Sequence, residues 1–251
     1  MARETLYRRN AVREVLRAGR RHMHRLWLQK GLDEATLAPF KELADALGVP
    51  VQYANKEKLA QLAQDKGHQG VVIEVGGYPY ASIDEMLALA RSRQEKPFLL
   101  LLDLVQGTQN VGSLLRTAEI CGVHGVIIQD RRAPDINATI VNYSVGAVEH
   151  LLLAQVTNLQ KTIQQLQQEE IWIAGLDMTP DAQPLGHIDL DRALALVVGH
   201  EGDGLRRLVR ERCDFIVKIP MRGQVDSLNA AAAGAVMLYA AWQARGFNGA
   251  R

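Results

Sequence analysis

The sequence predicts an α/β protein with a parallel β-sheet. Short apolar segments alternate with amphipathic helical segments along most of the 251 residues, which is typical of a parallel sheet with helices on both faces. The segment 97–105 is almost continuously hydrophobic, as expected for a strand buried on both faces. Changes in the pattern predict an α/β domain over residues 1–77, a linker over 78–96 and a second α/β domain over 97–251.

The first predicted domain alternates helices and strands. Its elements, in order, are a helix capped by Asn10 and ending near Gly19, a strand over 24–29, a helix over 37–48, a strand over 49–54, a helix over 56–64 capped by Asn55, and a strand over 70–75. In the linker, Ser82 and Glu85 have the spacing of a capping box, which predicts a helix there.

The second predicted domain has longer and more apolar strands. Its elements are strands over 97–105, 125–129, 151–156, 171–176, 194–199 and 215–221, and helices over 110–122, 137–150, 159–170, 205–213 and 227–245.

The composition is that of a globular protein. Hydrophobic residues make up 47% and charged residues 23% of the chain, which is ordinary for such domains. No apolar run reaches the roughly 18–20 residues of a membrane helix, and no signal peptide is recognisable, so we expect a cytoplasmic protein. Cys121 and Cys213 form no CxxC pair and are predicted to be small buried residues. His22 and His24 are the one close histidine pair, and no metal site is expected.

Positive charge is concentrated in the first thirty residues, although the net charge of the chain is only +1. Eight arginines and Lys30 stand there against Glu4 and Glu14. Such an excess can neutralise phosphates, although a charge run is more often a solvated helix surface. Arginine dominates, and its planar guanidinium matches phosphate oxygens, which favours phosphate contact.

The first of three candidate functional segments is the strand-to-helix turn at 103–119. Gly107 and Gly112 allow the backbone to turn tightly beside a ligand, and Asn110 lies at or near the helix N-terminus. Arg116 follows among residues of core type. A charged residue in such a stretch usually faces solvent or forms an ion pair, so spacing alone assigns Arg116 no function.

The second segment, 196–205, runs from an apolar strand into a glycine-rich loop. The G-x-x-G-x-G spacing that begins at Gly199 differs from the G-x-G-x-x-G dinucleotide fingerprint and follows a late strand. The sequence contains no phosphate-binding P-loop motif either. Glu201 lies in this loop, where an ordinary loop carboxylate would explain it equally well.

The third segment, 219–235, leads from an apolar strand through a loop into a long alanine-rich helix. Ser227 is predicted to be the N-cap of this helix, a role that accounts for most such serines. Asn229 in the first turn is less expected, because asparagine is a mediocre helix former. The small residues over 230–235 allow close helix packing, within the fold or across a dimer.

In this order, the three segments resemble the motifs of the SpoU (TrmH-type) family of SPOUT RNA 2′-O-ribose methyltransferases. The resemblance covers 97–251, and its most specific part is the third motif, I-P-M-x-G-x-x-x-S-L-N. Tyr7, Ala11, Val12 and the triplet 68–70 resemble the small ribosomal-protein-like RNA-binding domain of the longer members, which act on ribosomal RNA.

The resemblance implies methylation of a ribose 2′-hydroxyl in RNA, with S-adenosylmethionine as methyl donor and without a metal. It also implies a knotted C-terminal domain that forms a homodimer. By position in the motifs, the catalytic residues are Asn110, Arg116, Glu201, Ser227 and Asn229, and the donor-binding residues are Gly199, Ile219, Met221 and Leu228.

Arg116 is interpreted as the group that holds the substrate phosphate and hydroxyl. The family's arginine is proposed as a general base, but an arginine pKa above about 12 makes that role demanding, and we leave it open. Three positions depart from the family pattern. Gly107–Thr108–Gln109 stands where Asp-Pro is common, Ala231 where a second serine is usual, and Arg8 where a glycine follows the tyrosine.

Three alternatives remain at this point. A transfer RNA substrate is compatible with the motifs. A non-catalytic RNA-binding protein on the same fold is the main rival, although Asn110, Arg116 and Asn229 are all present. A Rossmann-type methyltransferase would need a glycine-rich loop after its first strand, and the turn at 106–110 lacks that pattern.

Overall fold

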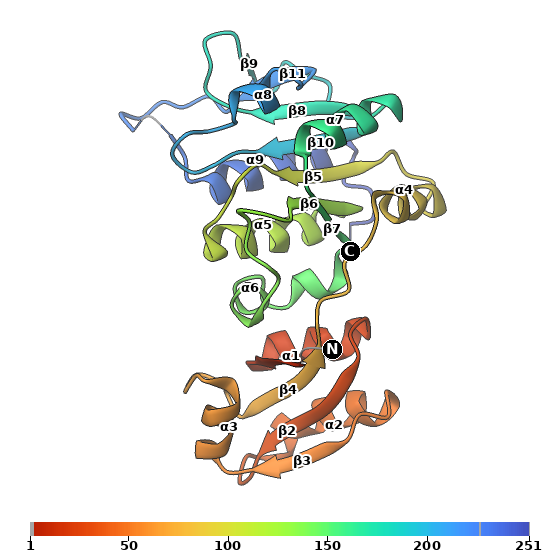
Figure 1. Cartoon of the computed structure of the whole chain (residues 1–251), viewed down its shortest axis with the longest axis vertical. Coiled ribbons are helices and arrows are strands. Elements are labelled where there is room, and N and C mark those ends of the chain that lie inside the picture. Colours follow the sequence, from red (N-terminus) through yellow and green to blue (C-terminus); the bar gives the residue numbers. More distant parts are fainter. Residues whose placement is uncertain (1–2, 226, 251) are drawn as a thin grey trace. The chain divides into compact units, whose positions relative to one another are not determined.

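The computed structural model describes residues 3–225 and 227–250, and they form two compact units (Figure 1). Unit 1 is Met1–Pro79 with Asp135–His150, and unit 2 is Tyr80–Pro134 with Leu151–Arg251. The predicted α/β class with a parallel sheet is confirmed. Residues 80–96, expected to be a linker, lie in unit 2, and residues 135–150, expected in the second domain, pack within unit 1.

Unit 1 is built on a mixed four-stranded sheet. Its strands are β1 (Arg3–Tyr7), β2 (Met23–Gln29), β3 (Val51–Ala54) and β4 (Val71–Gly76), in the order β1-β4-β2-β3. β4 pairs antiparallel with both β1 and β2, while β2 and β3 are parallel. Leu6, Leu26, Leu28 and Ile73 are completely buried, so the sheet carries the apolar core of the unit.

Three helices of unit 1 follow the predicted pattern, with one change in capping. They are α1 (Arg9–Ala18), α2 (Glu34–Ala46) and α3 (Lys56–Ala63). Asn55 caps α3 as predicted, through a bond from the Lys58 N–H to its Oδ1 (2.9 Å). The predicted cap at Asn10 is wrong, because α1 starts one residue earlier and has no side-chain cap at all.

The segment 135–150 forms two short helices instead of the single predicted one. These are α6 (Ala138–Tyr143) and the 3-10 helix η1 (Ala147–His150). Val145 and Gly146 interrupt them with φ values of 56° and 85°. A Cβ on Gly146 would lie 2.7 Å from the Cβ of Glu14, so the break lets this segment approach α1 closely.

A buried ion pair joins this segment to the rest of unit 1. Glu149, 1% exposed, accepts from Nε and Nη2 of Arg21, each at 2.9 Å in its shorter contact. Arg21 also donates to Glu4 (2.8 Å) and lies over the ring of Tyr78. Burial works to lower the pKa of Arg21, but the two carboxylates outweigh it and the pKa is raised. The pair is therefore a charged contact in the interior, where losing one partner is costly.

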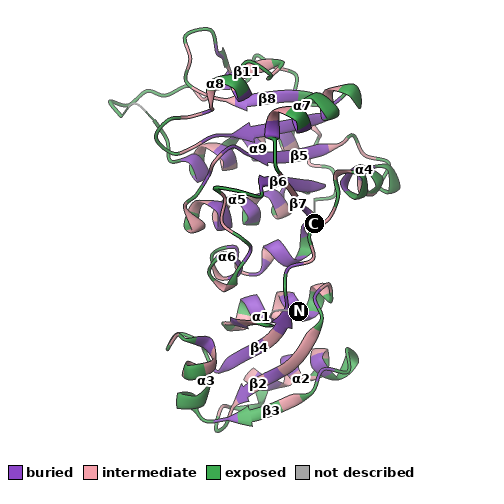
Figure 2. Ribbon diagram, in the orientation of Figure 1, coloured by how far each residue is buried: buried purple, intermediate pink, exposed green. Residues whose placement is uncertain are grey.

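Unit 2 contains a seven-stranded sheet in which every pairing is parallel. Its strands are β5 (Phe98–Leu102), β6 (Gly125–Gln129), β7 (Leu153–Val156), β8 (Trp172–Leu176), β9 (Gln183–Pro184), β10 (Leu194–Val198) and β11 (Phe215–Lys218). The order is β7-β6-β5-β10-β8-β11-β9. All residues of β5, β6 and β10 are buried (Figure 2), as predicted for strands covered on both faces.

Helices cover both faces of this sheet. They are α4 (Ile83–Ser92), α5 (Thr108–Ile120), α7 (Leu159–Gln168), α8 (Arg207–Arg210) and α9 (Ala230–Ala244). α4 and α7 share one apolar cluster with Leu99 and Val197. α9 packs on α5 so closely that a Cβ on Gly234 would lie 2.4 Å from Leu114. The capping box predicted from Ser82 and Glu85 begins α4.

Candidate functional site

The three predicted motif segments lie at one edge of the sheet of unit 2. Because β5, β8, β10 and β11 run parallel, the loops that follow them leave the sheet at the same edge. In open parallel sheets ligands bind in crevices at this carboxyl edge. The loops over 103–107, 199–206, and 219–225 with 227–229 therefore converge because of the sheet topology.

A pocket of about 230 Å³ lies between these loops. All four predicted donor-binding residues line it, namely Gly199, Ile219, Met221 and Leu228. Two predicted catalytic residues, Glu201 and Ser227, line it as well. Residues widely separated in the sequence thus surround one cavity.

Gly199 holds the wall of the pocket in a tight backbone turn. A Cβ on Gly199 would lie 2.4 Å from both the carbonyl carbon and oxygen of Gly204, closer than real Cβ contacts. His200 and Gly204 exchange two backbone hydrogen bonds, of 3.0 and 3.1 Å. The glycine at this position is thus required by the approach of two backbone segments.

The first and third segments meet through two asparagines. Nδ2 of Asn229 donates to Oδ1 of Asn110 (3.0 Å). Oδ1 of Asn229 accepts from the N–H groups of Ala231 (2.9 Å) and Ala232 (3.2 Å), so Asn229 is the N-cap of α9. The predicted cap at Ser227 is wrong, because the helix begins three residues later, at Ala230. This leaves the exposed Ser227 hydroxyl available to the pocket it lines.

Glu201 lies close to the start of α5. A Cβ on Gly107 would be 2.9 Å from Oε1 of Glu201 and 3.5 Å from Nδ2 of Asn110. The second segment thus contacts the first beside Gly107, and a side chain at that position would separate them. Asn110, Asn229 and Glu201 therefore form one polar cluster beside the pocket.

Arg116 lies apart from this cluster. It is exposed on α5, does not line the pocket, and forms no hydrogen bond or ion pair with the described residues. Six residues along a helix correspond to about 9 Å of rise and about 120° of rotation from Asn110. Arg116 is therefore on another side of α5, with its guanidinium unpaired.

Sequence reasoning missed the network that connects β5 to the loop after β10. Asp103 is completely buried and accepts from the backbone N–H (2.9 Å) and Nε (2.7 Å) of Arg206. Nη2 of Arg206 also donates to Gln129 (3.1 Å) at the end of β6. The signal was a carboxylate directly after an apolar strand, which needs a partner when it is buried.

The pocket lining contains carboxylates but no lysine or arginine among the described residues. Besides Glu201, Asp177 and Asp203 line it, and both were missed from the sequence. Leu176, Val198, Ile219 and Leu228 contribute apolar surface. Such a pocket suits a ligand that carries positive charge and an apolar or aromatic part.

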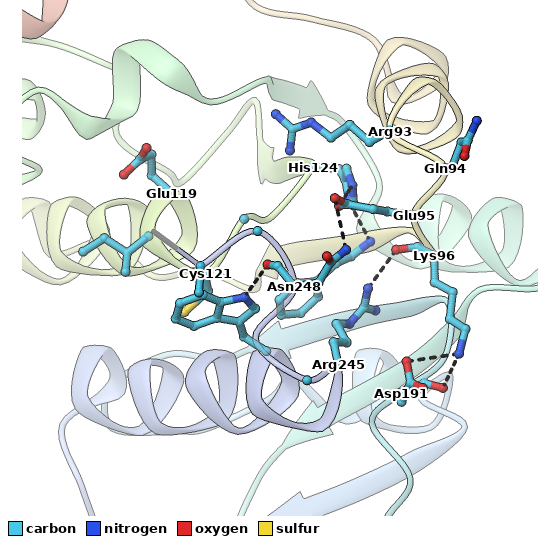
Figure 3. Close-up of a pocket in the computed structure, with 17 residues that line it drawn as sticks. Arg93, Gln94, Glu95, Lys96, Glu119, Cys121, His124, Asp191, Arg245 and Asn248 are labelled. Carbon is cyan, nitrogen blue, oxygen red and sulfur yellow. Dashed lines mark hydrogen bonds and ion pairs between the residues drawn. The ribbon is translucent and has the colours of Figure 1, made fainter.

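A larger cavity of about 940 Å³ occurs elsewhere in unit 2 and contains none of the predicted site residues (Figure 3). Several of its polar groups bond to one another. His124 bonds to Glu95 (3.0 Å), and Lys96 pairs with Asp191 (3.0 Å). Arg245 donates to the backbone oxygen of Lys96 (2.8 Å). Volume alone therefore does not identify a functional site here.

Neither cysteine is suited to nucleophilic chemistry. Burial raises the pKa of Cys121 to about 11. Burial, with nearby carboxylates, raises the pKa of Cys213 to about 12. Both thiols are protonated at neutral pH, whereas a cysteine nucleophile acts as the thiolate. Cys121 is buried as predicted, and Cys213 is partly buried.

Within residues 3–225 and 227–250, no cluster of side chains could hold a metal ion, and no helix is long and apolar enough to cross a membrane.

Comparison with known families decides the assignment. The model of the SpoU rRNA methylase family matches residues 97–239. The chain belongs to this family of RNA methyltransferases. A second model, described as RNA 2′-O ribose methyltransferase substrate binding, matches residues 6–81. The predicted family membership is thus confirmed, and the RNA-binding part precedes the methyltransferase part.

Known relatives match along nearly the whole chain. A Bacillus subtilis protein, provisionally named a TrmH family tRNA/rRNA methyltransferase, is 38% identical over 237 residues, 94% of each chain. The crystal structure of the SpoU methyltransferase AviRb from Streptomyces viridochromogenes, in complex with AdoMet, matches with a TM-score of 0.80 at 22% identity, covering 98% of this chain and 92% of AviRb. An AdoMet-bound rRNA methyltransferase from Sinorhizobium meliloti matches with a TM-score of 0.78 at 20% identity, covering 96% and 87%.

Proposed function

We propose that this protein transfers a methyl group from S-adenosylmethionine to a ribose 2′-hydroxyl of ribosomal RNA in the cytoplasm. The observation that carries the proposal is the convergence of three motif segments around one pocket, with Asn110 bonded to Asn229 beside it. Two related structures bind AdoMet according to their descriptions, and the relative that covers 96% of this chain is described as an rRNA methyltransferase.

The pocket fits the methyl donor in its chemistry. S-adenosylmethionine carries a sulfonium and an ammonium group against one carboxylate. Glu201 and Asp203 supply negative charge in a described lining without lysine or arginine, and Asp177 adds a carboxylate that also pairs with Arg210 (3.7 Å). Ile219 and Leu228 offer apolar surface for an adenine ring, and the backbone at Gly199 offers hydrogen-bonding groups without a side chain in the way. At about 230 Å³ the pocket is slightly below the roughly 300–1,000 Å³ typical of small-molecule sites, so part of the ligand would face the outside.

The residues of the chain act mainly by positioning. When bound, the donor supplies a methyl carbon that is already electrophilic. A ribose hydroxyl is a poor nucleophile until its proton leaves, so its placement relative to that carbon limits the rate. Asn110, Asn229 and Ser227 would orient the hydroxyl and its ribose by hydrogen bonds. The Asn110–Asn229 bond and the cap on α9 preset this arrangement before substrate binds.

Arg116 would hold the RNA phosphate next to the reacting ribose. Its exposed guanidinium has no partner among the described residues, so it is available to an external anion. Its distance along α5 from Asn110 is bridged most simply if a second copy of the chain brings the two together. We therefore include a homodimer through unit 2 in the proposal. Ile120, Val236 and Tyr239 on α5 and α9 are 42–54% exposed, which supports an interface on these helices.

The fold proposal includes a knot, as in the family. β10 inserts between β5 and β8 although it follows both in sequence, and α9 packs back on α5. This order is compatible with threading of the C-terminal part through an earlier loop. We also include in the proposal, from the resemblance to the family, that the N-terminal part is ribosomal-protein-like.

Mapping of 2′-O-methyl groups in RNA from a deletion strain tests the reaction and the substrate together. One ribose in ribosomal RNA should lose its methyl group, and purified protein with the donor should restore it. If the missing methyl group were found in transfer RNA instead, the substrate would be transfer RNA and not ribosomal RNA. A chain that binds the donor in calorimetry but restores no methyl group would support the non-catalytic rival.

Two variants of Arg116 test its role. Arg116→Ala should abolish methyl transfer while donor affinity and the dimer mass in light scattering stay unchanged. Arg116→Lys keeps the charge but loses the planar fork, so positioning predicts a large loss there too. Activity retained in the lysine variant, with a pH profile shifted toward a lysine pKa, would establish a general base instead.

A further inference from the structure

A second concave surface, in unit 1, has properties unlike those of the donor pocket. A cavity of about 580 Å³ lies between the start of α1, the end of β2, the start of α3 and the turn before β4. Four cationic side chains line it, those of Arg9, Arg13, Lys56 and Lys66, and no acidic residue among the described ones does. These residues come from three separate parts of the chain, so the fold gathers the charge. We call this surface the basic cavity.

Carboxylates near the basic cavity are already engaged elsewhere. Asp65 accepts from the hydroxyl of Tyr7 (3.0 Å) and from the N–H of Gly67 (2.5 Å). Asp33 accepts from the N–H of Thr36 (2.8 Å) and caps α2. Neither lines the cavity. None of the four cations forms an ion pair with a carboxylate of the described residues, although Asp33 acts on Arg9 from a distance, so the guanidinium and ammonium groups can still bind an external anion.

The start of α1 increases this demand for an anion. The helix has ten residues, no acidic residue in its first turn, and no side-chain cap at Arg8. The N-terminus of a helix carries partial positive charge, and cations placed there are unfavourable unless an anion compensates them. Arg9 and Arg13 nevertheless stand in the first two turns and line the cavity. This arrangement destabilises the free protein and favours binding of a phosphate.

The turn 68–70 fixes the shape of the basic cavity. Gln69 accepts from the backbone N–H of Arg9 at its Oε1 (3.1 Å) and from Nε of Arg9 at its carbonyl (3.0 Å). Nδ1 of His68 accepts from the N–H of Gly70 (3.0 Å). Gly70 has φ 82°, a backbone conformation that favours glycine, and a Cβ there would lie 2.3 Å from Cδ1 of Leu32. These bonds hold the backbone N–H and Nε of Arg9, while its remaining guanidinium donors stay available.

His68 adds a buried polar group to the wall of the basic cavity. It is 1% exposed, and its Nε2 makes no acceptable hydrogen bond with the described residues. Burial lowers the pKa of His68, partly opposed by the Lys56 backbone. The ring is neutral at pH 7, and the positive charge of the cavity comes from the arginines and lysines alone.

We propose that the basic cavity binds a backbone phosphate of the RNA substrate. The proposal rests on the proposed function only in taking RNA as the substrate. The match of residues 6–81 to a substrate-binding family model assigns the task to this part of the chain without naming a site. The basic cavity identifies one, and cationic contacts to phosphate oxygens explain how it would hold RNA of any sequence.

Binding of a fluorescently labelled single-stranded RNA of mixed sequence to the full chain tests the proposal. Lys56→Gln with Lys66→Gln removes two exposed lysines that line the basic cavity. Lys58→Gln with Lys30→Gln removes two exposed lysines of unit 1 that do not. Each lost phosphate contact should lower the slope of log K against log salt by about 0.7, and affinity at about 0.15 M salt by about fourfold. Because both lysines line the site of one phosphate, the cavity pair should bind about fourfold more weakly, and the control pair nearly as the parent.

The outcomes separate the possible ligands. Equal weakening in both pairs would mean that the positive charge of unit 1 as a whole attracts the RNA, and would overturn the basic cavity as a specific site. Unchanged RNA binding in the cavity pair, together with loss of inorganic phosphate binding in calorimetry, would make the site one for free phosphate and overturn the proposal. Unchanged binding of both would also overturn it, and would leave an acidic protein segment as the ligand to seek. Donor affinity is measured in parallel, and because RNA binding needs no turnover, a failure of the methyl-transfer proposal is seen separately.

Asn10→Asp gives a second test with two opposite signs. Asn10 is exposed, lines the basic cavity and lies in the first turn of α1. A carboxylate there should raise the melting temperature, because it compensates the helix terminus and the two arginines. The same carboxylate should weaken RNA binding, because it takes the place of the phosphate. A variant that is more stable and binds RNA as tightly as the parent would contradict the proposal.

Discussion

The pocket of unit 2 is formed by backbone, small residues, apolar side chains and carboxylates, whereas the basic cavity of unit 1 is formed largely by long cationic side chains. In unit 2, Gly199 and Gly204 are in backbone contact, and the pocket shape depends on short-range steric fit. In unit 1, Lys56 and Lys66 are exposed, and their effect depends on charge. Changes to the glycine wall of the donor pocket should therefore act abruptly and independently of salt, while changes to the basic cavity should act gradually and with strong salt dependence.

The interiors of the two units differ in the same way as the two cavities. Unit 2 has an apolar sheet core, with its buried Asp103 paired to the partly exposed Arg206. Unit 1 has Arg21 and Glu149 paired in the interior with side chains that are 0% and 1% exposed. Unit 1 thus depends on charge in its core as well as on its surface.

Glu149→Ala should have the largest effect on stability. It leaves the buried guanidinium of Arg21 with only Glu4 as a charged partner, and breaking such a pair costs roughly 3–5 kcal/mol. Glu211→Ala in unit 2 removes an exposed partner of Arg207 and should cost under about 1 kcal/mol. Both are measured by urea unfolding of the full chain. Similar small losses in the two variants would show that the pair in unit 1 contributes no more than a surface contact.

Gly199→Ala should have the next largest effect, and this effect on donor binding should be confined to unit 2. The new Cβ would meet the backbone of Gly204, and the strain of such overpacking, roughly 1–3 kcal/mol, corresponds to about 5- to 150-fold in donor affinity if it opens the pocket. Gly223→Ala, in a loop where a Cβ would meet no atom within 4 Å, is the matched control. Calorimetric titration of the donor at two salt concentrations should give the same loss. A loss that disappears at one of them would contradict a steric origin.

Much of this fold follows from local patterns, and the failures have physical reasons. Strands buried on both faces, such as β5 and β10, and the capping pair at Ser82 and Glu85 are set by short-range chemistry, so the sequence predicts them well. The strand β1 lies in a charged segment and is formed by pairing with β4, a contact that no local pattern reveals. The helix predicted over 137–150 is broken because Gly146 must approach α1.

Site residues could be predicted where a motif fixes both the residue type and its position. They were harder to predict where contacts with distant parts of the chain determine the structure. Gly199, Ile219, Met221 and Leu228 could be assigned from the motifs, and all line the pocket. The caps at Ser227 and Asn10 were wrong because serine and asparagine suit several positions near a helix start, and the start itself depends on tertiary contacts. Asp103 and Arg206 lie about a hundred positions apart, so their pairing emerges only from the parallel packing of β5 and β10.

Asn229→Ala should have an intermediate effect that separates structure from chemistry in unit 2. Loss of the N-cap of α9 should cost about 1 kcal/mol in unfolding free energy, and the bond to Asn110 is lost with it. Asn229→Ser can still cap the helix, so it should recover most of the stability but not the methyl-transfer rate. Full activity in the serine variant would mean that Asn229 serves only as a cap.

Arg8→Gly should have the smallest effect and the opposite sign, because here unit 1 lacks the glycine that unit 2 uses at its strained turns. Arg8 has φ 77° and ψ 140°, a region that only glycine adopts readily, and such strain costs of order 1–3 kcal/mol. Glycine relieves it but gives the unfolded chain more freedom, roughly 0.5–1 kcal/mol, so a strain of about 1.5 kcal/mol, in the lower part of that range, gives a net gain of about 0.5–1 kcal/mol.

Glu170→Gly in unit 2 is the matched control for Arg8→Gly. Glu170 has φ 58°, close to the left-handed helical region that ordinary residues tolerate at smaller cost, so its replacement should gain less. Urea unfolding of the two variants compares them directly. A loss of stability in Arg8→Gly would show that the arginine side chain, whose guanidinium lies 5.9 Å from the centre of the Tyr7 ring, contributes more than the backbone strain costs. In that case charge would hold unit 1 together even at the residue that precedes its first helix.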